Sequence, residues 1–208
     1  MHSVSQSSHP AAANTGVAES CLDQLFREAR TFSAWLPKPV PVALLRQAYE
    51  LARFGPTSGN SSPLRIAFLA TPEAKSRLLP ALDPGNVDKT KAAPVTAIMA
   101  WDTEFYEQLP KLFPHMDARS WFAGKPAAIE ETGFRNGTLQ GAYFIVAARA
   151  LGLDCGPMSG FSQAKVNAEF FPDGKWRANF LCNLGYGDRS KLLPRNPRLE
   201  FEEACVVL

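Results

Sequence analysis

One segment of the chain, residues 126–151, constrains the fold more than any other. It predicts a single long helix, within which Gly133, Gly137 and Gly141 recur at every fourth position and so share one face. Each glycine costs about 1 kcal/mol relative to alanine inside a helix. Three of them on one face indicate that another backbone or a flat ligand approaches closely. The alternative is a neighbouring helix of the same chain that packs tightly there.

Hydrophobic periodicity predicts the remaining elements. We expect helices over 19–30 and 44–52, a short helix after Thr71, and strands over 65–70, 95–101 and 178–184. The aromatic stretch 103–125 is expected to be irregular and to form a lid or an interface, with direct substrate contact as the alternative. Few strands and several helices predict an α+β fold. We expect one domain over 18–208 after a flexible tail over 1–17.

Composition excludes several classes of protein. A net charge of +2, without a long basic run, argues against a nucleic-acid partner. No segment approaches the roughly 18 apolar residues of a membrane span, and no secretory signal opens the chain. The four cysteines (21, 155, 182 and 205) and three histidines lack metal-site spacing, so we expect buried free thiols and no metal. These features favour a cytoplasmic protein.

The candidate chemistry lies in polar loops and isolated basic residues. Arg30 and Thr31 follow the first predicted helix, and Arg195 and Arg198 stand close together near the C-terminus. Two arginines hold a phosphate dianion well, because their forked N–H groups match its oxygens. The loop 57–60 offers hydroxyl and amide groups that can donate and accept along one edge of a polar heterocycle.

Six ordered motifs together carry a resemblance to a known family. They are ARTFSAW, GPTSGNSSP, GNVDKTKAAPV, LGLDCGPMSGF, NLGYGD and PRNPRLEFEEA. In this order they resemble the nitroreductase-type FMN oxidoreductases, over nearly the whole chain from about residue 20. The stretches WDTEFYEQLPKLFPHMDARSWF and GPMSGF are most similar to the malonic semialdehyde reductases of pyrimidine catabolism.

The resemblance implies a fold and a set of cofactor-binding residues. The fold would be nitroreductase-like, with a central mixed or antiparallel sheet surrounded by helices. Arg30 and Thr31 would lie near the FMN phosphate and ribityl chain, and Arg195 and Arg198 would complete a phosphate clamp.

The resemblance also places residues around the flavin ring. Asn86 and Lys89 would contact its pyrimidine edge. Ser159 and Gly160 would lie beneath the ring, with a backbone N–H approaching N5. No catalytic side chain is implied, since the hydride is exchanged at flavin N5, and Gly160 and Lys89 would serve as electrostatic supports.

Members of this family form intertwined homodimers, so the resemblance further implies two FMN sites built from both chains. Thr57, Ser58 and Asn60 match the loop that the partner subunit brings to the flavin. NADPH or NADH would supply the hydride.

Three functions follow as alternatives. The first is reduction of malonic semialdehyde to 3-hydroxypropanoate, with Arg65 or Arg119 as ligand of the substrate carboxylate. The second is a generalist NAD(P)H nitro- or quinone reductase, and the third is a flavin-binding protein without turnover.

Overall fold

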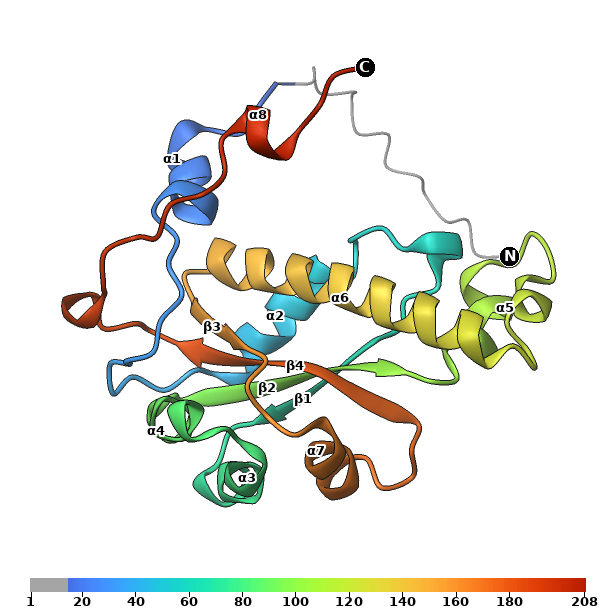
Figure 1. The fold of residues 1–208 in the computed structure, drawn as a ribbon, viewed down its shortest axis with the longest axis horizontal. Helices are drawn as coiled ribbons and strands as arrows, with labels where there is room; N and C mark the ends of the chain where they lie inside the picture. Colours follow the sequence, from blue (N-terminus) through green and yellow to red (C-terminus); the bar gives the residue numbers. More distant parts are fainter. Residues whose placement is uncertain (1–14) are drawn as a thin grey trace, which may run out of the picture.

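The computed structural model describes residues 15–208, which surround a four-stranded sheet (Figure 1). Its strands are β1 (Leu64–Leu69), β2 (Val95–Asp102), β3 (Asp154–Met158) and β4 (Trp176–Gly185), in the order β1-β2-β4-β3. Every neighbouring pair of these strands is antiparallel, which confirms the α+β expectation. The predicted tail falls outside the described residues as far as residue 14.

Three of the four strands follow the sequence prediction to within two or three residues at each end. The fourth, β3, was not predicted. Its sequence DCGPM contains no alternating pattern and includes Pro157, which a strand tolerates at the edge of a sheet.

Helices cover both faces of the sheet, as Figure 1 shows. One face carries α2 (Val42–Ala52) and the long α6 (Pro126–Ala150). The other face carries α3 (Pro72–Leu78) and α7 (Gln163–Phe170), with α4 (Pro84–Ala92) near one end of the sheet. No helix in the described range 15–208 is long and apolar enough to cross a membrane.

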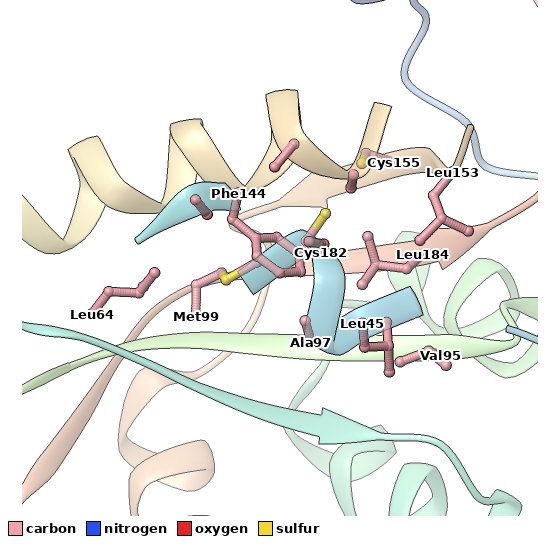
Figure 2. Packing of buried hydrophobic residues seen from close by; sticks show 14 residues of the cluster. Leu45, Leu64, Val95, Ala97, Met99, Phe144, Leu153, Cys155, Cys182 and Leu184 are labelled. Atoms are coloured by element: carbon pink, nitrogen blue, oxygen red, sulfur yellow. The ribbon is translucent and has the colours of Figure 1, made fainter. Parts of the chain in front are cut away.

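Each face has its own hydrophobic core. Between the sheet and helices α2 and α6, the Phe144 ring lies beside Met99 and Cys182 (Figure 2). Burial of a side chain of this size contributes about 1.5–3 kcal/mol. On the opposite face, Leu78 of α3 and Val166 of α7 pack against the sheet. The sheet is therefore held rigidly, and it positions the segments that leave its ends.

The three glycines of α6 face aromatic side chains of the sheet. A Cβ at Gly133 would lie 2.8 Å from Trp101 Cζ3, and one at Gly137 would lie 3.0 Å from Trp101 Cβ. A Cβ at Gly141 would lie 2.7 Å from Phe180 Cζ. The close approach predicted from sequence is thus present. Its partners are aromatic side chains of the same chain, rather than a backbone, a ligand or a neighbouring helix.

The first predicted helix is shorter than expected and changes type. An α-helical turn, α1 (Glu19–Leu22), runs directly into π-helical residues Asp23–Arg27, and the helix ends at Glu28. The aromatic stretch 103–125 contains only short helical turns: Phe105–Gln108, α5 (Leu109–Leu112) and Ala118–Trp121.

The last segment of the chain extends from the sheet toward α1 (Figure 1). It contains only a single helical turn, α8 (Phe201–Ala204), and residues 193–208 are all exposed. The apolar side chains exposed there are Leu193, Leu199, Phe201, Val206, Val207 and Leu208.

The four cysteines are free, but only two of them are buried as predicted. Cys155 and Cys182 lie in the core, whereas Cys21 and Cys205 are exposed. The prediction was wrong for these last two because their segments lie outside the sheet and its helical layers.

Candidate functional site

Residues from opposite ends of the chain meet in a cavity of about 510 Å³. Arg30 donates to the backbone oxygen of Leu193 at 2.5 Å. Arg195 donates to the backbone oxygens of Arg27 and Ala29 at 2.7 and 2.8 Å. These bonds join the end of the first helix to the C-terminal segment and bring Arg30, Thr31, Arg195 and Arg198 to one cavity.

The cavity is strongly basic. Its cationic side chains are Arg30, Arg149, Lys191, Arg195 and Arg198, and no carboxylate of residues 15–208 lines it. Arg30, Arg195 and Arg198 donate hydrogen bonds to backbone carbonyls. Because a carbonyl carries no net charge, these bonds leave the positive charge of the arginines unneutralised. Cations of one sign gathered in a concave site attract an anion. The hydroxyls of Thr31 and Ser33 add neutral donors to the same wall.

Arg149 is a member of this group that sequence reasoning missed. It lies in the last turn of α6, within the apolar stretch VAARALGL, where an arginine at a helix end is ordinary. Only its place in three dimensions relates it to Arg30 and Arg195.

The segment after Arg30 places the cavity at the edge of the sheet. Thr31 forms a parallel bridge with Cys155 of β3, and the N–H of Phe32 donates to the Cys155 oxygen at 3.1 Å. Gly160 follows Cys155 by five residues, at most about 18 Å of extended chain. A basic cavity and the loop after β3 therefore lie along one sheet edge.

A second group forms around Gly160. Asn86, which is buried in α4, donates through Nδ2 to the Gly160 oxygen at 2.6 Å. A Cβ at residue 160 would lie 2.6 Å from Asn86 Nδ2 and 2.9 Å from Asp83 Oδ2, so only glycine fits without a shift. The Gly160 N–H makes no hydrogen bond within residues 15–208, and Ser159 beside it is exposed.

Lys89 lies one helical turn after Asn86 on α4 and is half-buried. Its backbone oxygen accepts from Trp35 Nε1 at 3.2 Å and from Asn183 Nδ2 at 3.3 Å. Asn183 is itself fully buried in β4. These contacts fix the helix end that carries Lys89, and its ammonium forms no ion pair in the described part of the chain.

The third predicted group lies in a different part of the structure and consists of Thr57, Ser58 and Asn60. The Ser58 N–H donates to Asn136 Oδ1 of α6 at 2.9 Å, and Asn60 Nδ2 donates to the Leu112 oxygen of α5 at 2.8 Å. Thr57 Oγ1 accepts from the Ser62 N–H at 3.1 Å. None of these bonds reaches the basic cavity or the Asn86–Gly160 contact.

Both candidate carboxylate ligands are engaged by acids of the same chain. Arg65 pairs with Asp102 at 2.5 Å, and both side chains are largely buried. Arg119 forms two bonds of 2.7 Å with Glu107, and these hold the pKa of the Glu107 carboxyl below its ordinary value. Each guanidinium therefore already has a carboxylate partner in this arrangement.

Comparison with known proteins identifies the family. The sequence profile of the nitroreductase family matches residues 27–186, most of the chain. The chain belongs to the nitroreductase family. A family member from Ralstonia nicotianae, provisionally named NADH dehydrogenase/NAD(P)H nitroreductase, is 60% identical over 91% of this chain and 97% of its own length. A similarly named protein of Polynucleobacter asymbioticus is also 60% identical, with the same coverage.

Solved structures share the family's fold. A provisionally assigned nitroreductase of Bacillus subtilis superposes with a TM-score of 0.84 at 20% identity, covering 92% of this chain and all of its own. A provisionally assigned nitroreductase of Exiguobacterium sibiricum, solved in complex with FMN, gives a TM-score of 0.80 at 16% identity. It covers 95% of this chain and all of its own. The nitroreductase-like fold expected from the motifs is thereby confirmed.

Proposed function

We propose that this nitroreductase-family chain is an FMN-dependent oxidoreductase that uses a reduced nicotinamide to reduce malonic semialdehyde to 3-hydroxypropanoate in pyrimidine degradation. One observation carries the flavin assignment. A cavity lined by five cations and no carboxylate shares a sheet edge with a free backbone N–H at Gly160.

The residues present fit FMN at both ends. The basic cavity supplies forked donors for a doubly charged phosphate. Near Gly160, the absence of a side chain and the unused N–H leave room and a donor for the edge of a flat ring. Gly160 lies five positions after Cys155, which is beside the cavity, and a ribityl chain would join the two ends. Both the FMN complex of the Exiguobacterium relative and the names of the curated relatives agree with FMN and NAD(P)H as cofactors.

Arg30, Thr31, Arg195 and Arg198 would hold the phosphate. The carbonyl bonds of the arginines keep their side chains in place before the anion arrives, which reduces the entropy lost on binding.

Asn86, Lys89, Ser159 and Gly160 would surround the ring. When bound, the flavin supplies two-electron hydride chemistry at N5. Lys89 would stabilise the negative charge that reduction leaves near N1 and O2, in a half-buried position where electrostatic interactions exceed those in bulk water. Asn86 holds the Gly160 carbonyl and so aims the neighbouring N–H.

A second copy of the chain would complete the site. The loop of Thr57, Ser58 and Asn60 lies away from the phosphate cavity in one chain, so these residues would serve the site of the partner. Large apolar side chains are exposed on α2, just after it and along the C-terminal segment, Phe54 at 79% and Leu193 at 79% among them. Apolar surface of this extent is typical of an interface.

Malonic semialdehyde as the acceptor is supported by the similarity of residues 101–122 and of GPMSGF to malonic semialdehyde reductases. The ion pairs of Arg65 and Arg119, and the nitroreductase names of relatives at 60% identity, favour a second candidate, a generalist NAD(P)H nitro- or quinone reductase.

Steady-state assays distinguish the two acceptors. The purified protein is assayed with 3-oxopropanoate, a nitroaromatic and a quinone, each with NADPH and with NADH. The proposal predicts the highest kcat/KM for 3-oxopropanoate. Turnover of the nitroaromatic and the quinone alone would contradict it and establish the generalist reductase.

A further inference from the structure

Arg149 has an unusual environment for an arginine. Its Nε is buried and has no hydrogen-bond partner among the described residues. The one bond of its side chain, from Nη1 to the Leu25 oxygen, is long at 3.3 Å. The side chain is half-buried and forms no ion pair within residues 15–208, although a charge that is partly withdrawn from water is normally paired.

The surroundings of Arg149 explain what could pair with it. Its side chain lines the same basic cavity as Arg30 and Arg195. No acid among the described residues lines that cavity. Asp23, Glu28 and Asp154 line an adjacent cavity together with Arg149, but none of them forms an ion pair with it, so its positive charge stays uncompensated. The missing partner is therefore an anion that enters the cavity from solution.

Arg149 also differs from the other cations in where it comes from. Arg195 and Arg198 belong to the exposed C-terminal segment, and the half-buried Arg30 belongs to the irregular segment after the first helix. Arg149 belongs to the last turn of α6, whose adjacent residues Ala147 and Ala148 are packed in the core. Arg149 is thus the cation of the cavity that is carried by a helix packed against the core.

We propose that Arg149 is a fourth arginine of the phosphate site, which reaches from the core and binds the phosphate of the flavin nucleotide. The inference rests on the proposed function and extends it to a residue for which the family motifs imply no role. With a phosphate present, the guanidinium gains the charged acceptor that the fold does not supply.

The alternative is a purely structural role. Arg149 helps to join α6 to the first helix, since its backbone oxygen accepts from Gln24 Nε2 at 2.8 Å and its side chain reaches Leu25. Such a joint would affect every ligand of the site equally. A phosphate contact would affect only ligands that carry the phosphate.

Riboflavin, which is FMN without its phosphate, separates the two roles. Dissociation constants of FMN and riboflavin are measured by fluorescence titration for wild type, Arg149→Met, Arg149→Lys and Gln24→Ala. The Met variant fills the space without charge, and the Lys variant keeps the charge without the fork. The Gln24→Ala variant weakens the joint to α6 and leaves the guanidinium intact.

We expect Arg149→Met to weaken FMN binding about tenfold to a hundredfold while riboflavin binding stays unchanged. Arg149→Lys should give an intermediate loss, and Gln24→Ala should leave the ratio of the two constants at the wild-type value. If Arg149→Met does not fold, the ratio measured for Arg149→Lys decides.

An equal loss for both ligands, or no loss for either, overturns the role of Arg149. That result differs from a failure of the proposed function. In the latter case, the wild-type protein itself would bind FMN no more tightly than riboflavin, or would bind neither.

Discussion

Arg30 donates a hydrogen bond to the backbone oxygen of Leu193, 163 residues further along the chain. This bond, together with the bonds of Arg195 to the oxygens of Arg27 and Ala29, joins the two segments of the chain that line the basic cavity. Neither segment alone supplies all of the residues that line the cavity. Binding of an anion should therefore hold both ends of the chain against the sheet edge.

Arg198→Ala should reduce phosphate binding without affecting the fold. Arg198 is exposed and bonds only to the adjacent carbonyls of Asn196 and Pro197, so its loss disturbs no distant contact. A hydrogen bond to a charged group contributes about 1.5–3 kcal/mol, so FMN affinity should fall tenfold to a hundredfold. Riboflavin affinity and Tm should remain those of wild type. Retention of FMN through dialysis as complete as in wild type would refute the clamp.

Gly160→Ala should act on the ring end instead. The new Cβ would lie 2.6 Å from Asn86 Nδ2 and force that amide away from the Gly160 oxygen. Loss of one neutral hydrogen bond costs about 0.5–1.5 kcal/mol, so FMN and riboflavin should both bind roughly threefold to tenfold more weakly. Parallel titrations check this, and a loss confined to FMN would show that residue 160 does not face the ring.

Gly133→Ala should destabilise the fold itself. The added methyl would clash with the Cε3 and Cζ3 atoms of the buried Trp101 ring, and overpacking of this kind costs about 1–3 kcal/mol. That exceeds the gain of up to about 1 kcal/mol from helix propensity. Urea unfolding of flavin-free protein measures the difference. Gly85→Ala, which adds a methyl to α4 with no atom within 4 Å, is the matched control and should only gain stability, by up to about 1 kcal/mol from helix propensity.

The thiols of Cys155 and Cys182 should not react until the protein unfolds. A hydrogen bond with Cys155 and burial raise the pKa of the Cys182 thiol well above its ordinary value, so the reactive thiolate is scarce at neutral pH. Both side chains lie in the core between the sheet and α6 (Figure 2). Labelling with a thiol reagent, followed by mass spectrometry, should modify the exposed Cys21 and Cys205 first. Rapid labelling of Cys182 in the folded protein would contradict this packing.

Periodic burial explains which elements could be predicted. Helices α2 and α6 each bury one regular side, so their apolar residues recur with helical spacing. The missed helices α4 and α7 are short and mostly polar, and each buries only one or two residues. Strand β3 was missed because Gly156 and Pro157 interrupt its pattern.

The residues of the candidate site likewise divide into those that the sequence predicted and those that it did not. Ordered motifs pointed to Arg30, Asn86, Gly160 and Arg195, because these residues stand in loops or beside helix ends where local sequence is distinctive. Arg149 stands in an unremarkable helical stretch, and only the packing of α6 against the first helix brings it to the cavity. The engagement of Arg65 by Asp102 likewise depends on strand pairing, which composition cannot show.

The most direct test of the central claim is an anaerobic titration of the purified, FMN-loaded protein with NADPH and, separately, with NADH, followed by visible absorption. We expect a yellow protein whose flavin absorption bleaches promptly with at least one nicotinamide and returns when an acceptor is added. A yellow protein that fails to bleach would be a flavin binder without turnover. A colourless protein that does not take up FMN would contradict the proposal that this chain binds a flavin.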